Sequence, residues 1–484
     1  MVTDSKMFID GSWVAANGGE TFDDMNPFSG EVYARVPAGS REDAGRAIAA
    51  AQAAFPKWAS SPPAMRREIF LKAADIMERR QDELVRAMME EVGGTIGISM
   101  FQMHFVPGLY RMAAGAGYDV KGEVIPADHA DSFFMAIRQP AGVVACFAPF
   151  NVPYILGSRS FTFPMAYGNT IVLKPSEEAP LTGGLLLAEI FEEAGLPPGV
   201  LNVITSTREA AADVGDEMIS NPAVRRISFT GSTEVGRIIA EKAGRNLKRA
   251  VLELGGKDPL IILGDADIDY AVDAAAWGAF LHQGEICMST ERIIVEKSVA
   301  EEFTAKLAQR AEQTPMGDPT DPATAIGPLI NQAAVDKVDA HVQEAIDGGA
   351  RLVSGGKHEG LVYHPTVVTE VDPGMRLFRE QTFGPVAPIV VVDDRDEALA
   401  IANDSEYGLS SGIITNDFTR ALDMAMKLEM GMVHIGDQTV NDEPQAPFGG
   451  VKGSGYGRFG GQAALDEFTE LKWINVQRTP RTFP

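Results

Sequence analysis

Apolar segments typical of buried β-strands alternate with helical segments along most of this chain. Between residues 141 and 254, helical stretches separate the apolar runs 142–148, 170–173, 200–204, 226–230 and 250–254. A second alternation extends from residue 259 to about residue 436, with apolar runs at 260–263, 292–295, 387–392 and 433–435. This pattern is typical of parallel sheets with helices on both faces. We therefore predict an α/β fold with two Rossmann-like parallel-sheet domains in series, divided near Gly255 and Gly256.

The residues before this alternation have a different character. Short strands and turns are expected up to residue 40, with Asn26-Pro27 as a turn signal. Ser40 is placed to cap an alanine-rich helix that runs to about Phe55, and helical periodicity continues from Ala64 to about residue 112.

Composition narrows the classes of partner and compartment. The 484 residues are 45% apolar and carry a net charge of −25. An acidic surface is repelled by nucleic-acid phosphates and anionic lipids, so we expect neither nucleic acid nor membrane as a partner. The N-terminal residues contain no apolar signal core, and prolines interrupt the long apolar stretch 142–157. Two cysteines fit a reducing compartment, so we expect a cytoplasmic protein.

Cys287 and Glu253 define a candidate reaction class. A thiol that ionises and a carboxylate that activates water are what the formation and hydrolysis of a thioester require. Most cysteines are inert core residues, and Cys146, within an apolar run, fits that interpretation. Cys287 instead lies among small and polar residues in the segment 284–290, where a helix is expected to give way to a strand.

Three further segments follow predicted strands and carry polar residues. Asn151, between two prolines, is either a fixed amide donor for an oxyanion or part of a plain turn. The turn at Gly231 and Ser232 opens a helix whose free N–H groups suit a pyrophosphate, although an ordinary helix cap explains it as well. Lys174 and Glu177 are placed to bind ribose hydroxyls, and the alternative is an exposed charged loop.

Together these segments resemble the motifs of the NAD(P)-dependent aldehyde dehydrogenases. The resemblance covers nearly the whole chain, from Asn26-Pro27 to the segment 467–470. Seven motifs occur in family order: Pro149-Phe150-Asn151, Lys174-Pro175-Ser176-Glu177, Phe229-Thr230-Gly231-Ser232, Glu253-Leu254-Gly255-Gly256-Lys257, Gly284 to Cys287, Phe383-Gly384-Pro385, and Pro447-Phe448-Gly449-Gly450.

The resemblance implies a role for each matching residue. Cys287 is expected to be the nucleophile, Glu253 the general base and Asn151 the oxyanion donor, so that an aldehyde is oxidised through a cysteine thiohemiacetal and thioester. The cofactor is expected to be NAD in preference to NADP, because a carboxylate at position 177 repels a 2′-phosphate. The residues expected to contact the cofactor are Pro149, Phe150, Lys174, Ser176, Glu177, Gly231, Ser232, Gln381 and Phe383.

Three positions depart from the usual family pattern. Glu285 replaces a common glutamine two residues before the nucleophile, and a carboxylate pointing inward there would raise the pKa of the thiol. Gln381 stands where a glutamate commonly binds the nicotinamide ribose, so we expect weaker cofactor binding with activity retained. Phe150 replaces a common tryptophan, which is a mild change.

The substrate is expected to be an aromatic aldehyde that carries a hydroxyl group in some cases. The segment 286–292 resembles the branch of the family that acts on salicylaldehyde, benzaldehyde and vanillin. Arg159 stands where many aliphatic-aldehyde enzymes have an aromatic residue, and it is either a substrate contact or a structural ion pair. The residues expected to line the substrate site are Tyr154, Arg159, Ile286, Met288 and Phe448.

The resemblance also implies a domain arrangement and a set of alternatives. It gives an NAD-binding domain from residues 1–120 and 141–252, a catalytic domain from 253–453, and a β oligomerisation element from 121–140 and 454–484 that joins a homodimer or homotetramer.

An aliphatic or semialdehyde dehydrogenase remains an alternative. A coenzyme A-acylating enzyme is disfavoured by Glu253, and a non-catalytic paralogue by the intact Cys287 and Asn151. Seven histidines without metal-ligand spacing predict no catalytic metal.

Overall fold

A computed structural model describes residues 3–483, and its largest sheet contains the first series of predicted strands. Five parallel strands form the centre of this sheet, and antiparallel strands extend both edges. Within the described residues its eight strands are, in spatial order, β22 (Gly455–Tyr456), β12 (Arg249–Glu253), β11 (Val224–Thr230), β8 (Val143–Ala148), β9 (Thr170–Pro175), β10 (Leu201–Val203), β2 (Met7–Ile9) and β3 (Ser12–Val14). Every residue of β8 and β9 is buried, as expected for strands covered on both faces.

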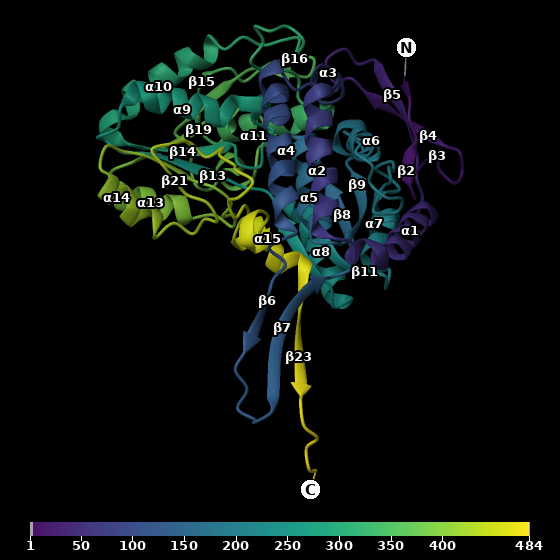
Figure 1. The fold of residues 1–484 in the computed structure, drawn as a ribbon. Coiled ribbons are helices and arrows are strands. Elements are labelled where there is room, and N and C mark those ends of the chain that lie inside the picture. Colours follow the sequence, from purple (N-terminus) through teal and green to yellow (C-terminus); the bar gives the residue numbers. More distant parts are fainter. Residues whose placement is uncertain (1–2, 484) are drawn as a thin grey trace.

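Helices cover both faces of this sheet (Figure 1). α1 (Arg41–Ala59) begins with a capping box, in which the Ser40 hydroxyl accepts from the Asp43 N–H and the Asp43 carboxylate accepts from the Ser40 N–H. The alanine-rich face of α1 is buried against β8, β9 and β10. The other helical segments of this region are α5 (Pro153–Ala166), the π-turn η1 (Leu181–Leu185), α6 (Leu186–Glu193), α7 (Ala211–Ser220) and α8 (Thr233–Arg245).

Three helices precede the central strands of the sheet and pack against one another. They are α2 (Pro63–Arg79), α3 (Gln81–Val92) and α4 (Ile96–Ala116). α4 contacts α2, α3 and α5. The contact between α4 and α5 forms one wall of the pocket described below.

A second sheet contains the other series of predicted strands. All of its neighbouring strands are parallel except β15 and β18. Within residues 3–483 its seven strands are β15 (Arg351–Ser354), β18 (Thr366–Thr369), β19 (Val386–Val392), β14 (Thr290–Glu296), β13 (Asp258–Ile262), β20 (Gly412–Ile414) and β21 (His434–Ile435). The helical segments of this part are α9 (Ile268–Phe280), η2 (Leu281–Gly284), α10 (Lys297–Glu312), α11 (Gln332–Asp347), α12 (Arg376–Arg379), α13 (Arg395–Asn403), α14 (Phe418–Ala425) and η3 (Lys452–Ser454). The predicted α/β class with two parallel sheets is therefore confirmed.

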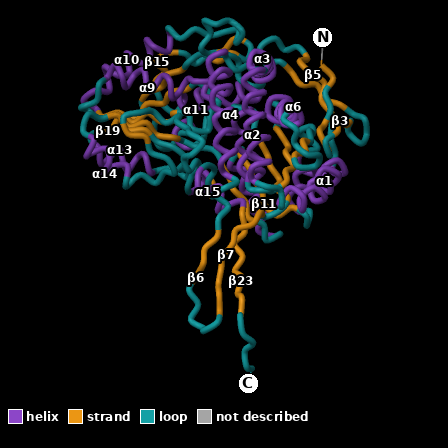
Figure 2. The backbone as a smooth tube through the Cα atoms, viewed as in Figure 1, coloured by secondary structure: helices purple, strands orange, loops and turns teal. Residues whose placement is uncertain are grey.

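A three-stranded antiparallel sheet projects from the body of the molecule (Figures 1 and 2). It consists of β6 (Gly122–Ile125), β7 (Ser132–Pro140) and β23 (Thr469–Gln477). Leu471 and Trp473 on β23 are 64% and 65% exposed, so this arm carries apolar surface into solvent. The predicted second segment of the element begins too early, because Gly455–Tyr456 pairs with β12 of the large sheet and α15 (Gly461–Phe468) packs against α5.

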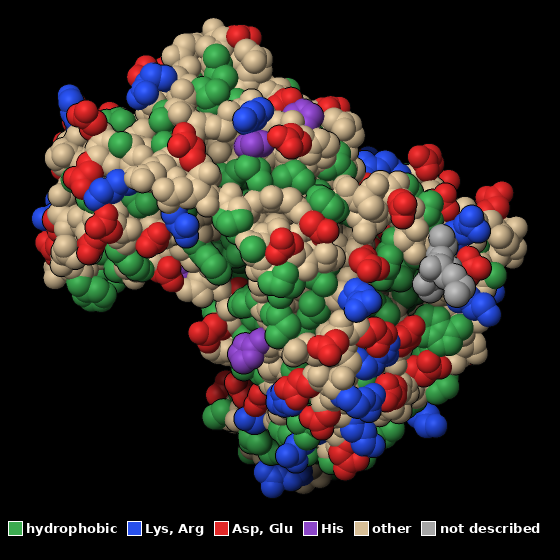
Figure 3. All heavy atoms as spheres, turned by 90° about the horizontal axis from the view of Figure 1, so that it is seen from above, with side chains coloured by type: hydrophobic (Ala, Val, Ile, Leu, Met, Phe, Trp, Pro, Cys, Tyr) green, Lys and Arg blue, Asp and Glu red, His purple; other side chains and the backbone are tan. Residues whose placement is uncertain are grey.

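Two small sheets complete the described structure. They are formed by β1 (Thr3–Asp4), β5 (Val32–Pro37) and β4 (Thr21–Met25), and by β16 (His358–Glu359) and β17 (Val362–Tyr363). Residues 1, 2 and 484, which the predicted domains include, lie outside the described residues. Among the helices of residues 3–483, none has the length and apolar character needed to cross a membrane. On the face seen in Figure 3, acidic and basic side chains are interspersed.

Candidate active site

The three predicted catalytic residues come from separate elements and meet at one place. Asn151 lies between β8 and α5, and Glu253 is the last residue of β12. Cys287 lies between η2 and β14. It therefore belongs to the part of the chain that forms the second sheet, and it lies at the edge where strands of the first sheet end. Asn151 and Glu253 are almost fully buried, and Cys287 is partly exposed to the adjoining pocket.

The backbone before Cys287 makes an unusual turn. His282, Gln283 and Gly284 have φ of 50°, 55° and 73°, so three successive residues are in the left-handed region. This conformation is costly for the two non-glycine residues, and surrounding contacts must hold it. The Gln283 side-chain amide donates to the carbonyl of Pro328 at 2.9 Å. At Gly284 a Cβ atom would lie 2.2 Å from the carbonyl oxygen of Gly384, so only glycine allows this close approach.

The Asn151 amide is fixed by this same turn. Its Nδ2 donates to the backbone carbonyl of Glu285 at 2.8 Å. The His282 ring contacts the backbone carbonyl of Asn151 through Nε2 at 2.5 Å, and because burial lowers the pKa of His282 to about 4, the ring is neutral and donates there. An amide nitrogen has two hydrogens, so one remains to stabilise an oxyanion next to Cys287.

Cys287 and Glu253 influence each other's protonation. Burial, and then the nearby Glu253 charge, raise the pKa of the Cys287 thiol well above its usual range. Burial also raises the pKa of Glu253 to about 7, while the thiol and Arg159 act in the opposite direction. Within residues 3–483 neither carboxylate oxygen of Glu253 has a partner in hydrogen-bond geometry. A buried carboxyl with a pKa near neutrality is suited to act as a general base at physiological pH.

The Glu285 carboxylate is held by a hydrogen bond from a neighbouring loop. Its Oε1 accepts from the Ile330 N–H at 3.2 Å. Burial raises the pKa of Glu285 to about 8, with the Ile330 hydrogen bond opposing the shift and Glu178 adding to it. The carboxyl is therefore largely protonated at neutral pH and adds little negative charge near Cys287.

A groove of about 540 Å³ lies over the carboxyl ends of β8, β9 and β11. This is the edge at which parallel α/β sheets generally bind nucleotides. Most of the predicted cofactor residues line it, namely Pro149, Phe150, Lys174, Ser176, Glu177, Gly231 and Ser232. The Ser232 hydroxyl caps α8 by accepting from the Val235 N–H at 3.3 Å.

The polar side chains of this groove suit a dinucleotide. Lys174 is 7% exposed, and burial lowers its pKa. The Lys174 ammonium donates to the Pro175 carbonyl at 3.3 Å, so its other N–H groups are available in the groove for ribose hydroxyls or phosphate. Glu177 pairs with Arg208 at 3.1 Å at the same end of the groove.

Gln381 and Phe383, the two remaining predicted cofactor residues, belong to a separate loop after α12. The Glu291 carboxylate holds this loop by accepting from the N–H groups of Thr382 and Phe383 at 2.9 and 2.8 Å. Lys257 pairs with Glu291 at 2.6 Å. Phe383 also packs edge-on against Phe150, with ring centroids 6.1 Å apart, which links the loop to the groove.

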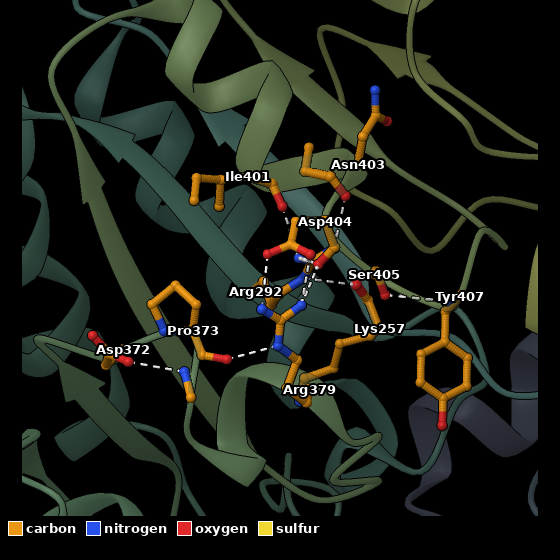
Figure 4. A network of polar contacts seen from close by, with 12 residues as sticks. Lys257, Arg292, Asp372, Pro373, Arg379, Ile401, Asn403, Asp404, Ser405 and Tyr407 are labelled. Atoms are coloured by element: carbon orange, nitrogen blue, oxygen red, sulfur yellow. Dashed lines mark hydrogen bonds and ion pairs between the residues drawn. The ribbon is translucent and has the colours of Figure 1, made fainter.

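Arg292 fixes the strand that carries Glu291 to its surroundings (Figure 4). Its side chain is fully buried and donates to the carbonyls of Lys257, Ile401 and Ala402 at 2.9 to 3.1 Å. Arg379 joins the network by pairing with Asp404 at 2.7 Å. These positioning residues were not predicted, and the charged pair Glu291 and Arg292 after the Cys287 motif is the one sequence signal that points to them.

A second cavity, of about 370 Å³, opens directly at Cys287. Four of the five predicted substrate residues line it: Arg159, Ile286, Met288 and Phe448. Tyr154 does not, and this prediction is wrong, because its fully buried hydroxyl donates to the Leu84 carbonyl at 3.0 Å in the core. Phe101 and Trp277 are large, exposed and part of the pocket lining, and neither was predicted from the sequence.

Arg159 forms an ion pair, which is one of the two roles expected for it from the sequence; the other is a substrate contact. Its partner is Asp442, and both side chains are nearly buried within the lining of the pocket. The guanidinium carbon lies 4.2 Å from the centroid of the Phe448 ring. The two interpretations are thus compatible, since the ion pair itself faces the pocket.

Comparison with known proteins identifies the family to which this geometry belongs. Residues 13–474 match the model of the aldehyde dehydrogenase family. The chain belongs to the aldehyde dehydrogenase family. This aldehyde dehydrogenase is 47% identical to a vanillin dehydrogenase of Pseudomonas fluorescens over 99% of each chain. It is 42% identical to an NAD(+) benzaldehyde dehydrogenase of Pseudomonas putida, over 98% of this chain and 96% of the relative.

A solved structure agrees with the whole fold of this aldehyde dehydrogenase. The crystal structure of a salicylaldehyde dehydrogenase from Pseudomonas putida G7, complexed with salicylaldehyde, matches it with a TM-score of 0.97, 42% identity and full coverage of both chains. The resemblance inferred from the seven motifs is therefore confirmed, and the protein is an oxidoreductase that acts on aldehydes with NAD(P).

Proposed function

We propose that this aldehyde dehydrogenase oxidises aromatic aldehydes to carboxylic acids with NAD+ as its preferred oxidant. The observation that carries the proposal is the cavity at Cys287, whose walls contain Phe101, Trp277 and Phe448. Aromatic rings that flank a narrow apolar cavity favour a flat ring over a flexible chain. The names of the relatives, which include vanillin and benzaldehyde dehydrogenases, support the same substrate class.

The first chemical step is addition of a thiolate to the aldehyde. Glu253, with a pKa of about 7, is placed to receive the Cys287 proton, so that Sγ attacks the aldehyde carbon. The free amide hydrogen of Asn151 then stabilises the oxyanion. When bound, NAD+ supplies the acceptor for the hydride that leaves the aldehyde carbon.

The second step is hydrolysis of the thioester on Cys287. After the thiol proton has passed from Glu253 to solvent, the Glu253 carboxylate takes a proton from water, whose oxygen attacks the acyl carbon. The C–S bond then breaks, the carboxylic acid leaves, and the Cys287 sulfur takes up the proton held by Glu253. Aldehyde, NAD+ and water thus give acid, NADH and a proton. A buried base beside the thioester favours water over coenzyme A as the acceptor, which argues against the acylating alternative.

The proposed preference for NAD+ over NADP+ depends on Glu177, which lines the 540 Å³ groove. Glu177 is placed to accept hydrogen bonds from both hydroxyls of an adenosine ribose, and its charge repels a 2′-phosphate. Arg208 would attract such a phosphate, but it is paired with Glu177 and Glu178 at 3.1 and 2.9 Å. We therefore assign preference for NAD+ to Glu177.

The projecting sheet of β6, β7 and β23 supports an oligomeric assembly, and the two free cysteines support a reducing compartment. The exposed apolar residues of β23 fit a homodimer or homotetramer in which the arm is covered by another subunit. Both cysteines are free, and a nucleophilic thiol requires a reducing compartment such as the cytoplasm. Light scattering of the purified protein tests the assembly, and a monomer at micromolar concentration would contradict it.

A substrate panel tests the proposed activity. The values of kcat/KM are compared for benzaldehyde, salicylaldehyde, vanillin, hexanal and succinic semialdehyde, with NAD+ or NADP+ and with or without coenzyme A. We expect the aromatic aldehydes and NAD+ to give the highest values, with no dependence on coenzyme A. A higher value for hexanal or the semialdehyde would refute the aromatic assignment.

A further inference from the structure

The turn before Cys287 has a strained backbone that depends on contacts from elsewhere in the chain. His282 and Gln283 are in the left-handed region, with φ of 50° and 55°, and Glu285 has φ of −85° and ψ of 42°, outside both the helical and the extended regions. Such conformations persist only where the surroundings fix them. For this turn, the surroundings include the loop 327–331, which precedes α11.

Within residues 3–483, three hydrogen bonds connect this loop to the turn. The Gly327 N–H donates to Oε1 of Gln283 at 3.2 Å, and Nε2 of Gln283 donates to the carbonyl of Pro328 at 2.9 Å. The Ile330 N–H donates to Oε1 of Glu285 at 3.2 Å. All five residues are buried, where an unpaired donor or acceptor is unfavourable. The loop and the turn therefore hold each other in one arrangement.

The loop is itself anchored on both sides. A Cβ atom at Gly327 would lie 2.4 Å from the carbonyl oxygen of Gly93, so the backbone of the loop packs directly on the end of α3. At the other end, the Asn331 side chain caps α11 by accepting from the Ala334 N–H at 3.0 Å, and it donates to Glu178 at 2.9 Å. The turn before the nucleophile is thus supported by a loop with fixed ends.

The turn in turn fixes the amide of Asn151. Nδ2 of Asn151 donates to the backbone carbonyl of Glu285 at 2.8 Å, so the position of this carbonyl sets the direction of the second amide hydrogen. A displacement of about 1 Å in a catalytic group can lower a rate about a hundredfold. A side chain that holds the Glu285 backbone in place can therefore affect the reaction without touching the substrate.

We propose that Gln283 and Glu285 are positioning residues, which clamp the turn before Cys287 to the loop 327–331 and so hold the Asn151 amide in the direction that stabilises the oxyanion. Neither residue is among the described residues that line the cavity at Cys287 or the cofactor groove, so each acts through the backbone that it holds. The inference rests on the proposed oxyanion role of Asn151 and adds the residues that direct its amide.

The chemical requirement at position 285 is an acceptor and not a charge. A protonated carboxyl and a carboxamide both present a carbonyl oxygen to the Ile330 N–H, whereas an aliphatic side chain presents none. Glu285→Gln is therefore the matched control for Glu285→Leu, because the two variants have side chains of similar size and differ in the acceptor.

The first test measures single-turnover rate constants for NADH formation in wild type, Glu285→Gln and Glu285→Leu, each also combined with Asn151→Ala. Enzyme and NAD+ are saturating over the aldehyde, so the rate constant does not depend on the fraction of folded protein. The substrate is the aldehyde of the panel above that reacts best, so the result does not depend on the aromatic assignment. Fluorescence titration without aldehyde gives the dissociation constant for NAD+.

Glu285→Leu should lower the rate constant about tenfold to a hundredfold, and Glu285→Gln should stay within about threefold of the wild type. In the Asn151→Ala background, Glu285→Leu should lower the rate constant by less than about threefold, because the amide that it positions is absent. The dissociation constant for NAD+ should not change in any variant. A wild-type rate constant in Glu285→Leu, or an equal loss in both backgrounds, would overturn the proposal.

A second measurement needs no variant and remains decisive if Glu285→Leu does not fold. Hydrogen–deuterium exchange of the wild type should be slower in the loop 327–331 than in the exposed turn 318–324 by at least about tenfold. Equal exchange in the two segments would contradict the clamp. An unimpaired Glu285→Leu refutes this inference alone, whereas a wild type that prefers hexanal refutes the aromatic assignment and leaves the clamp in place.

Discussion

The side-chain amide of Asn151 donates a 2.8 Å hydrogen bond to the backbone carbonyl of Glu285, two residues before Cys287. This bond ties the turn after β8 to the turn before β14, so the two sheets of the molecule are locked together at the nucleophile. It also sets the plane of the amide, so that the second hydrogen is directed before any substrate binds. Donors fixed in advance stabilise a developing charge without the cost of reorganisation.

Substituting Asn151 tests the oxyanion role. Asn151→Ala should lower kcat/KM for benzaldehyde by about a hundredfold to a thousandfold and leave the dissociation constant for NAD+ unchanged. Steady-state kinetics and fluorescence titration of the cofactor measure the two effects. Asn441→Ala, at an exposed asparagine, is the matched control. A loss below about threefold would show that another group stabilises the oxyanion.

Substituting Glu253 separates the two halves of the reaction. Glu253→Gln should still give a burst of about one NADH per active site, formed more slowly than in the wild type because residue 253 no longer receives the thiol proton. It should lower the steady-state rate by about 10²–10⁴, because hydrolysis of the thioester is slowed most. Stopped-flow absorbance records the burst. In the wild type the hydrolysis-limited rate should rise with pH as Glu253 loses its proton near pH 7, and then level off. An unchanged pH profile in Glu253→Gln would contradict this role.

Continuous apolar runs made the sheets predictable. Strands buried on both faces have no polar side to interrupt them, and the predicted runs 142–148 and 170–173 correspond to β8 and β9. The short strands β18 and β20 were not predicted, because four and three residues are too few to show a strand pattern in the sequence. Edge strand β22 was also missed, because its two residues precede a helix and carry no apolar run.

The candidate site was predictable where a motif fixes it and not where tertiary contacts do. The catalytic trio and the groove residues follow strand ends, whose position in an α/β sheet is known in advance. Tyr154 was misplaced because all residues of α5 are buried, so helical periodicity cannot tell which side faces the cavity. Asp442 was missed because it lies in a loop 283 residues from its partner Arg159.

Glu285 should give the protein a pH-dependent stability. Its pKa is about 8 in the folded state and near 4.5 when unfolded, so between these values the folded state binds more protons and the free energy of unfolding falls as pH rises. Glu285→Gln removes this titration. The Tm of the variant minus the Tm of the wild type should therefore increase from pH 5 to pH 8. Calorimetry over this range measures the difference, with the exposed Glu359→Gln as control. A Tm difference independent of pH would contradict the burial argument.

Gln381 should limit the affinity for the cofactor. A carboxylate accepts hydrogen bonds from ribose hydroxyls more strongly than an amide does. In the described residues the side-chain nitrogen of Gln381 is buried without a partner. Gln381→Glu should therefore lower KM for NAD+ by about threefold to tenfold and leave KM for benzaldehyde unchanged. An unchanged KM for NAD+ would show that this residue does not contact the ribose.

Glu177 should control the choice between NAD+ and NADP+ through Arg208. The carboxylate repels a 2′-phosphate and also pairs with Arg208 at 3.1 Å, so Glu177→Ser removes a repulsion and leaves Arg208 with Glu178 as its remaining ion-pair partner. We expect kcat/KM for NADP+ to rise by about tenfold or more and that for NAD+ to fall, measured with saturating benzaldehyde. The double variant Glu177→Ser with Arg208→Ala tests the contribution of the Arg208 charge, because it should lose most of the gain with NADP+.

Glu178→Ser is the matched control, since Glu178 also pairs with Arg208 but lies outside the groove lining. If Glu177→Ser leaves the ratio of the two cofactors unchanged, the discrimination resides elsewhere in the groove.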